Sequence, residues 1–144
     1  MVLLHNVKTY EEFINLLEEL KVAASEHSVY IYFTSSITDT NDQSWCPSCN
    51  AAWSVIQKCL DHVNPQAIFI KAEVGSKEEW ESKNNPFKMN SRYKVKVLPT
   101  LLHWKSYQRL EGAYCAKPDI VELLFDESEA VNYTQLSMSE RQTC

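Results

Sequence analysis

The sequence predicts an α/β domain in which a central mixed β-sheet is flanked by helices on both faces. Two segments, Val29–Thr34 and 67–74, are short apolar runs rich in β-branched and aromatic residues, as expected of buried strands. Segments with helical periodicity lie before and between them, and a short hairpin and a closing helix follow. Strands that alternate with helices indicate a sheet that is covered on both faces.

The first helix is expected to begin after Thr9 and to run to about residue 25. The Thr9 hydroxyl can cap the first turn while the Glu12 side chain reaches back, which is the reciprocal pattern of a capping box. One helical face is apolar, and its residues are Phe13, Ile14, Leu17, Leu20 and Ala24. The strand Val29–Thr34 is expected to be central, because its sequence VYIYFT is rich in β-branched and aromatic residues.

A second helix is expected from Pro47 to about residue 63, after the polar loop SSITDTNDQS. Proline suits the first helical position, and Asn64 and Pro65 end the pattern. The apolar residues at helical spacing are Cys49, Trp53, Ile56, Leu60 and Val63. The later elements are a strand at 67–74, short helical pieces within 77–93 broken at 84–86, a strand at 95–104 interrupted by Pro99, a return strand at Arg109–Glu111 and a helix at Pro118–Phe125.

Length and composition indicate one globular domain. The chain has 144 residues, 44% of them hydrophobic, and contains no internal repeat, low-complexity tract or Gly/Ser linker. A chain of this size buries roughly 70% of its unfolded surface and can fold alone. We expect a domain at residues 1–128 and a polar, flexible tail at 129–144.

Composition also excludes several classes of function. With Gly75 and Gly112 as its two glycines, the chain cannot contain a glycine-rich nucleotide-binding motif. Nineteen acidic residues against fourteen basic ones give a net charge of −5, which disfavours nucleic acid as a partner. No apolar stretch is long enough for a membrane span. Five cysteines, an odd number with one close pair, indicate a reducing compartment, so a cytoplasmic location is expected. The chain is also expected to be a monomer.

The segment Trp45-Cys46-Pro47-Ser48-Cys49 carries the chemistry. It lies between a predicted buried strand and a helix start. There, unpaired backbone N–H groups and the positive end of the helix dipole favour a thiolate on Cys46, which we expect to be the lower-pKa and more exposed thiol. Cys49, one turn later, can attack a mixed disulfide that Cys46 forms with a target. These residue types predict a redox dithiol.

The alternatives are a pair of inert buried thiols or a pair of zinc ligands. Zinc is considered because Cys46, Cys49, Cys59 and His62 spell C-x2-C-x9-C-x2-H. If residues 47–63 form one helix, the ten residues from Cys49 to Cys59 span ~15 Å, whereas zinc bonds are ~2 Å long. One helix cannot fold back on its own metal, so no metal site and no bound cofactor are expected. Cys59 is interpreted as a small core residue.

Pro99 interrupts the strand pattern in Val97-Leu98-Pro99-Thr100, which indicates an edge, a bulge or a cis bond. About fifty residues after a Cys-x-x-Cys pair, it resembles the cis-proline loop that faces the dithiol throughout the thioredoxin superfamily. We therefore expect a cis Leu98–Pro99 bond that faces Cys46 across a shallow groove.

Five segments make the resemblance specific: YFTSS, SWCPSC, EVGSKEEW, NNPF and VLPTLL. In order and spacing, from about residue 7 to 125, they resemble the thioredoxin domain-containing protein 17 family of cytosolic disulfide reductases. The resemblance implies a thioredoxin-like fold, with Cys46 as the nucleophile, Cys49 as the resolving thiol and Pro99 as the cis-proline. It also implies electrons from NADPH through thioredoxin reductase. The implied substrates are small disulfides such as cystine and selected protein disulfides or persulfides, and peroxidase activity is implied as well. Docking residues are expected at Trp45, Pro47, Ser48, Leu98, Pro99 and Thr100.

Two positions depart from this resemblance. Ser48 stands where the family has an acidic residue, and Tyr32 falls where ordinary thioredoxins bury a carboxylate behind the dithiol. The proton acceptor for Cys49 is therefore open between Glu73 and solvent, and solvent is favoured because Glu73 is expected to be a solvated residue at a strand end.

Other candidates are interpreted as structural. Trp53 fits the core face of its helix, no chemistry is assigned to Trp80 or Trp104, and Cys115 is expected to be partly exposed. The histidines form no cluster and are expected at the surface: His5, His27, His62 and His103. Cys144 is the last residue, so it cannot belong to a prenylation box.

The sequence leaves three functions to compare. The leading one is a thiol–disulfide oxidoreductase that reduces disulfides. A glutaredoxin-like enzyme is less favoured, because Leu101, Leu102 and His103 stand where glutaredoxins carry a glycine pair after the cis-proline. The third is a protein-interaction module whose binding is modulated by the redox state of the pair.

Overall fold

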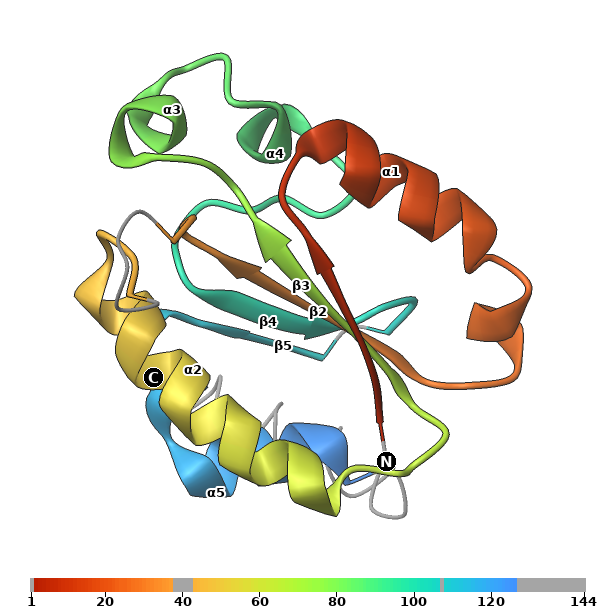
Figure 1. Cartoon of the computed structure of the whole chain (residues 1–144). Helices are drawn as coiled ribbons and strands as arrows, with labels where there is room; N and C mark the ends of the chain where they lie inside the picture. The colour runs from red at the N-terminus through yellow and green to blue at the C-terminus, as the bar shows by residue number, and fades with distance from the viewer. Residues whose placement is uncertain (1, 38–42, 107, 127–144) are drawn as a thin grey trace, which may run out of the picture.

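The computed structural model describes residues 2–37, 43–106 and 108–126, and it contains one five-stranded sheet (Figure 1). The strand order is β1-β3-β2-β4-β5, in which β2 is parallel to β3, β3 is parallel to β1, and β4 is antiparallel to both β2 and β5. The strands are β1 (Leu3–Val7), β2 (Val29–Thr34), β3 (Ile68–Glu73), β4 (Thr100–His103) and β5 (Arg109–Glu111). As predicted, the strand VYIYFT is central.

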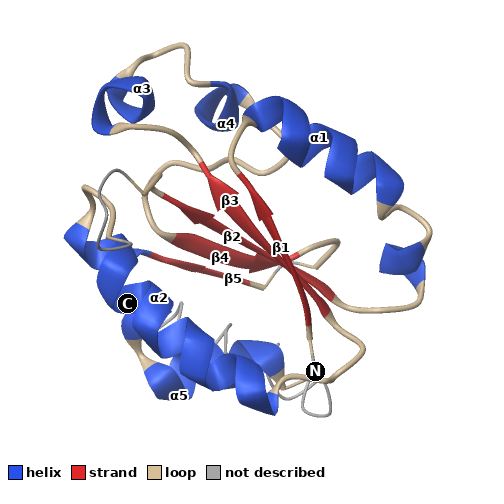
Figure 2. Cartoon of the chain, viewed as in Figure 1, coloured by secondary structure: helices blue, strands red, loops and turns tan. Residues whose placement is uncertain are grey.

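Helices cover both faces of the sheet (Figure 2). One face carries α1 (Tyr10–Glu19), α3 (Lys77–Glu81) and α4 (Pro86–Met89), and the other carries α2 (Pro47–Cys59) and α5 (Pro118–Phe125). Three short 3-10 turns complete the described elements: η1 (Ala23–Ser25), η2 (Leu60–His62) and η3 (Gly112–Ala116). The expected mixed sheet between two helical layers is confirmed.

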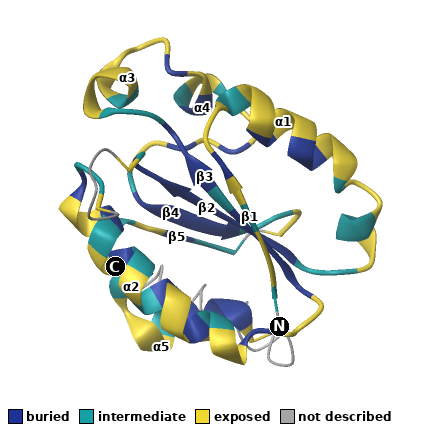
Figure 3. Cartoon of the chain, viewed as in Figure 1, coloured by how far each residue is buried: buried dark blue, intermediate teal, exposed yellow. Residues whose placement is uncertain are grey.

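Two hydrophobic clusters form the core, one on each face of the sheet, and alternation along β2 supplies both. Ile31 and Phe33 belong to the cluster under α1, whereas Tyr30 and Tyr32 belong to the cluster under α2 and α5. All six residues of β2 are buried. Figure 3 shows the buried sheet between helices whose outward faces are exposed.

The N-terminal segment differs from its prediction in three ways. Strand β1, which pairs with β3 at the edge of the sheet, was not expected. Its hydrophobic alternation is weak, because Leu3 and Leu4 are both exposed. Helix α1 ends at Glu19, and η1 replaces its predicted last turn. Ile14, predicted for the apolar face, is 36% exposed. The capping box is half formed.

In that half-formed box, the Thr9 hydroxyl accepts from the N–H of Glu12 at 3.1 Å. The Glu12 carboxylate accepts from the N–H of Lys8 at 3.4 Å rather than from Thr9 itself. The side chain thus reaches one residue further back than the reciprocal pattern requires.

The later elements follow the predictions closely. The boundaries of β5 and α5 agree with them, and two short helices lie within 77–93. The predicted strand 95–104 is reduced to β4, because pairing with β2 begins after Pro99. The predicted tail, residues 129–144 with Cys144, lies outside the described residues. Among the residues that are described, no helix is long and apolar enough to cross a membrane.

Candidate active site

The two cysteines lie at the start of α2, beyond the carboxyl end of the central strand. Cys46 is the N-cap residue with extended backbone, and Pro47 occupies the first turn, as its fixed φ favours. The Cys46 Sγ accepts a hydrogen bond from the N–H of Cys49 at 3.2 Å. Both thiols are free. Cys46 is 8% exposed and Cys49 1%, so Cys46 is the more exposed of the two, as expected.

The pKa of Cys46 differs from the expectation of a low value. Burial, the largest cause, raises the pKa together with a hydrogen bond to Cys49 and charge repulsion from it, and the pKa of Cys46 is about 11. The N–H of Cys49 and the Ser35 hydroxyl act in the opposite direction. The helix N-terminus therefore stabilises a Cys46 thiolate, but the loss of hydration outweighs it.

A polar network that the sequence analysis missed holds the loop before Cys46. Asn50 clamps Ser44: its Oδ1 accepts from the Ser44 N–H at 3.0 Å, and its Nδ2 donates to the Ser44 carbonyl at 3.0 Å. The Ser44 hydroxyl is hydrogen bonded to the Ser35 hydroxyl and accepts from the N–H of Cys46 at 3.2 Å. The signal for this network was Asn50 itself, since asparagine is a poor helix former whose side chain often binds nearby backbone.

Tyr32 lies behind the dithiol, as its alignment with the buried carboxylate of thioredoxins implied. Its hydroxyl donates to the carbonyl of Cys49 at 3.0 Å, and its ring stacks on Trp53 with centroids 5.7 Å apart. Burial raises the pKa of Tyr32 far above its ordinary range, so it stays protonated at neutral pH. Tyr32 anchors the first turn of α2 and does not exchange protons there.

Glu73 is not the solvated strand-end residue that was expected. It is 4% exposed, and its carboxylate accepts from Asn6 Nδ2 at 2.9 Å and from the N–H of Ile37 at 3.4 Å. The physical reason is that β1 and the loop after β2 close over it. Its oxygens are engaged by these groups, which leaves solvent as the favoured proton acceptor for Cys49.

The Leu98–Pro99 peptide bond is cis, as predicted. Pro99 directly precedes β4, whose first residue pairs with Phe33 near the carboxyl end of β2, so the proline lies at the same end of the sheet as Cys46. Leu98 is half-buried, while Pro99 and Thr100 are buried, and the Thr100 hydroxyl donates to the Val97 carbonyl at 2.8 Å. That Pro99 faces Cys46 across a groove stays a prediction.

Turn η3 holds the Pro99 carbonyl. That oxygen accepts from the N–H of Gly112 at 2.8 Å and from the thiol of Cys115 at 3.7 Å. The expectation of a partly exposed Cys115 was wrong, because β5 and η3 bury it completely. Burial raises the pKa of Cys115 to about 12, and the nearby Cys49 contributes to the rise. A third thiol therefore lies close behind the dithiol.

The remaining predicted docking residues differ in exposure. Trp45 is half-buried and anchored, because its Nε1 donates to the carbonyl of Gly75 at 3.1 Å. Pro47 and Ser48 are exposed in the first turn of α2. These three positions thus combine a fixed aromatic ring with accessible small residues.

The four residues of the possible zinc pattern are not brought together by the fold. Helix α2 is continuous from Pro47 to Cys59, Cys59 is buried in the core as expected, and His62 lies 3.3 Å from Glu122 instead. Over the described ranges, no three His, Cys, Asp or Glu side chains are placed to hold a metal ion. Of the histidines predicted at the surface, only His62 is exposed among these four, because His5, His27 and His103 are half-buried. The ring of His103 packs on Tyr30 with centroids 4.7 Å apart.

Comparisons with known proteins agree with this geometry. Residues 6–127 match the family model described as the thioredoxin domain of thioredoxin domain-containing protein 17-like proteins. The mouse thioredoxin domain-containing protein 17 is 37% identical over 123 residues, which cover 83% of this chain and 98% of the mouse protein. The human protein of the same name is 37% identical over 122 residues, covering 82% and 97%.

More distant similarities extend to plant proteins and to ordinary thioredoxins. A thioredoxin-like protein Clot from Arabidopsis thaliana is 34% identical over 90 residues, covering 61% of this chain and 67% of that protein. The crystal structure of reduced Schistosoma mansoni thioredoxin superposes with a TM-score of 0.55 at 18% identity, covering 85% of this chain and 98% of that one. Poplar thioredoxin h gives 0.51 at 14% identity, covering 94% and 96%. These structures share a thioredoxin-like fold with the chain.

Proposed function

The chain belongs to the thioredoxin domain-containing protein 17-like family of thioredoxin domains, a family of thiol–disulfide oxidoreductases, and from this membership we propose that it reduces disulfides with Cys46 and Cys49. The observation that carries the proposal is the pair itself. Two free thiols are joined by the Cys49 N–H to Cys46 Sγ hydrogen bond at the first turn of a helix, and Cys46 is the more exposed. Small disulfides such as cystine and selected protein disulfides or persulfides are the proposed substrates.

The reaction proceeds in two exchanges. The Cys46 thiolate attacks one sulfur of the substrate disulfide, a mixed disulfide forms, and the other substrate sulfur leaves as a thiolate that takes a proton. Cys49 then loses its proton to solvent and attacks the Cys46 sulfur, which releases the second substrate thiol. Two electrons have moved from the dithiol to the substrate, and a Cys46–Cys49 disulfide remains.

The oxidised pair must be reduced before another cycle. We propose that NADPH supplies the electrons through thioredoxin reductase, as the family resemblance implies, with no cofactor bound to this chain. Trp45, Pro47, Ser48, Leu98, Pro99 and Thr100 form the proposed docking surface. Hydroperoxide reduction, also implied by the resemblance, would use the same two thiols. An odd number of cysteines with one close pair is typical of a reducing compartment, so we propose a cytoplasmic location, and we propose that the chain acts as a monomer.

The competing proposal is a redox-modulated interaction module with little turnover. The raised pKa of Cys46 favours it, since a buried thiol holds its proton and little thiolate exists at neutral pH. Insulin or cystine reduction with NADPH and thioredoxin reductase separates the two. Continuous NADPH oxidation that depends on the presence of this chain supports the enzyme. Oxidation of one equivalent of NADPH per chain, with no further turnover, supports the interaction module.

A further inference from the structure

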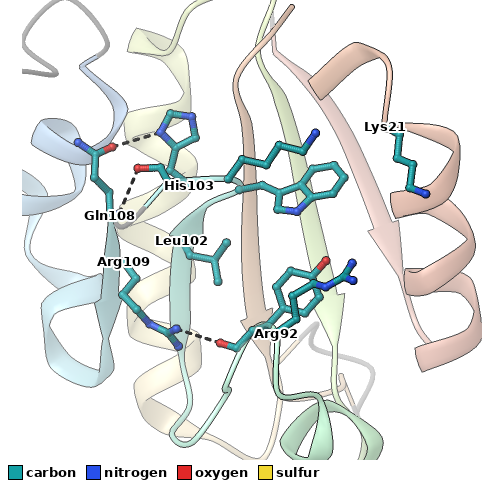
Figure 4. A pocket seen from close by; sticks show the side chains of 10 residues that line it. Lys21, Arg92, Leu102, His103, Gln108 and Arg109 are labelled. Atoms are coloured by element: carbon teal, nitrogen blue, oxygen red, sulfur yellow. Dashed lines mark hydrogen bonds between the residues drawn. The ribbon is translucent and has the colours of Figure 1, made fainter. Parts of the chain in front are cut away.

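A cavity lies on the sheet near the β4–β5 hairpin, away from the dithiol. It has a volume of about 500 Å³, within the roughly 300–1,000 Å³ typical of small-molecule sites. Its described lining comes from the end of α1, the segment after α4, and the β4–β5 hairpin. In Figure 4, Lys21 lies at the right of the view, Arg109 at the left, and Arg92 between them.

The lining is strongly basic. Lys21, Arg92, Lys105 and Arg109 line the cavity, and its described lining contains no Asp or Glu, although the whole chain carries a net charge of −5. Lys21 and Arg109 are each within 3.2 Å of a glutamate outside the lining. Arg92 and Lys105 form no salt bridge with any residue that the structure describes. A concentration of cations in an acidic protein attracts an anion to this one place.

The basic walls are held in position by hydrogen bonds. Arg109 donates to the carbonyl of Tyr93 at 2.9 Å and to that of Lys94 at 3.2 Å, which ties the hairpin to the segment after α4 (Figure 4). The Asn90 side chain accepts from the N–H of Arg92 at 2.9 Å and from that of Tyr93 at 3.3 Å. Among the residues that the structure describes, the buried Arg109 Nε has no hydrogen-bond partner. Arg109 therefore fixes the backbone of two walls of the cavity to each other.

The floor of the cavity is aromatic and apolar. Trp104 and Tyr93 line it together with Leu102. The Lys105 ammonium lies 5.3 Å from the centroid of the Trp104 ring. The backbone N–H of Trp104 donates to the Val29 carbonyl at 2.7 Å, which fixes the hairpin to β2. Aromatic side chains stack with planar rings, and arginine guanidinium groups bind phosphate oxygens in a fork.

We propose that this cavity binds a small organic anion in which a planar ring is joined to a phosphate group, as in a nucleoside monophosphate. The ring packs against Trp104 and Tyr93, and the phosphate is held by Arg92 and Lys105. Backbone donors from a glycine-rich loop are not needed, because side chains supply the positive charge.

The site is separate from the dithiol chemistry. Its Leu102 pairs with Ile31 and its His103 with Tyr30 in the first half of β2, whereas Cys46 lies beyond the carboxyl end of that strand. None of its described lining residues is a proposed docking residue. Ligand binding here is thus expected to leave disulfide exchange at Cys46 unchanged when tested with a small disulfide.

The experiment is an NMR titration of the full chain in low salt with AMP, adenosine and inorganic phosphate as separate probes. We expect AMP to shift the Trp104 indole signal and the amides of residues 92–93 and 102–106, and adenosine and phosphate to bind more weakly. Because charged hydrogen bonds to the phosphate are lost, Arg92→Gln and Lys105→Gln should each weaken AMP binding roughly tenfold or more. Lys88→Gln, a lysine over Trp80 outside the cavity, is the control and should bind AMP like the wild type.

Several results would overturn the proposal. Equal affinities for adenosine and AMP would show that the phosphate plays no role. If Lys88→Gln lost as much AMP affinity as the two cavity variants, the effect would come from the net charge of the chain and not from the cavity. Tighter binding of a poly-glutamate peptide than of AMP would identify the surface as a protein-docking site. Unchanged spectra at millimolar AMP would show that the cavity takes no such anion. Both glutamine variants should keep wild-type cystine reduction, so these outcomes do not depend on the proposed reductase activity.

Discussion

At the scale of single residues, two opposing influences set the reactivity of Cys46. The Cys49 N–H and the Ser35 hydroxyl stabilise its thiolate, while burial and the second sulfur destabilise it, and the net effect raises the pKa to about 11. A thiol on the helix N-terminus is therefore not automatically acidic.

We expect Cys46→Ser to abolish disulfide reduction and Cys49→Ser to trap mixed disulfides with substrate, because only the second thiol can release the first. With limiting iodoacetamide, Cys46 should be alkylated before Cys49, since it is the more exposed, and mass spectrometry of the digested protein reads the order. Cys59→Ser, a buried core position, should retain turnover. Alkylation of Cys49 first would reverse the assigned roles.

The alkylation rate of Cys46 should rise with pH. Its pKa is raised, so the thiolate fraction increases roughly tenfold per pH unit below that pKa. Iodoacetamide alkylation rates measured between pH 7 and 10.5 give this dependence of the rate on pH. A rate that levels off near pH 7 would show that burial does not control the thiol.

Ser48 offers a charge test next to the same sulfur. It is exposed in the first turn of α2, and Ser48→Asp should raise the pKa of Cys46 by roughly half to one unit through repulsion of the thiolate. At alkaline pH, where the Cys46 thiolate forms, a less stable thiolate disfavours the reduced form, so the variant pair should be less oxidising there than the wild type. Ser54→Asp, exposed further along the same helix, is the matched control and should shift the curve less. A lower pKa in Ser48→Asp contradicts the electrostatic argument.

At the scale of elements, the start of α2 is positioned by side chains from outside the Cys-x-x-Cys segment. Asn50 clamps Ser44, Tyr32 holds the Cys49 carbonyl, and η3 holds the Pro99 carbonyl through Gly112 and Cys115. Helix α2, strand β2 and turn η3 thus each contribute hydrogen bonds that hold the backbone of the site.

Asn50→Ala should lower the free energy of unfolding by about 1–2 kcal/mol, since two hydrogen bonds to partly buried backbone groups are lost. Urea unfolding of the reduced protein measures it. Gln57→Ala, on the exposed part of α2, is the control and should change stability by less than about 0.5 kcal/mol. Equal stability of the two variants would mean that the clamp contributes nothing.

At the scale of the whole molecule, the buried thiols make stability fall in alkali. The folded-state pKa values of Cys46 and Cys115, about 11 and about 12, lie above the ordinary thiol value of about 8.5. A raised folded pKa gives stability that is complete below the unfolded pKa and is lost as pH rises through the folded one. We expect the free energy of unfolding to decline from about pH 8.5 upward.

Cys115→Ser separates this effect from general alkaline damage. The serine hydroxyl does not titrate in this range, so the variant should lose less stability than the wild type between pH 8.5 and 11.5, even if it is less stable at pH 7. Urea unfolding across this pH range in reducing buffer supplies the two curves. If the free energy of unfolding fell equally with pH in both proteins, the pKa of Cys115 would be the same in the folded and the unfolded chain.

The sequence by itself determined the features that depend on neighbouring residues. Pro47 and the periodicity after it placed the dithiol at a helix start, and VYIYFT indicated the central strand. Pro99 indicated an edge, a bulge or a cis bond, and the family resemblance selected the cis bond that the structure has. Caps, turns and helical faces involve residues within a few positions of each other, which is why their signals can be read locally.

Only the tertiary structure decided how deeply each group is buried and what it meets there. The raised pKa of Cys46, the buried carboxylate of Glu73 and the contact of Cys115 with Pro99 all arise between segments far apart in the chain. Strand β1 was missed for the same reason, since its exposed leucines are ordered by pairing with β3, more than sixty residues away. Burial is a property of the assembled layers, and a periodic pattern shows which face turns inward but not what lies opposite it.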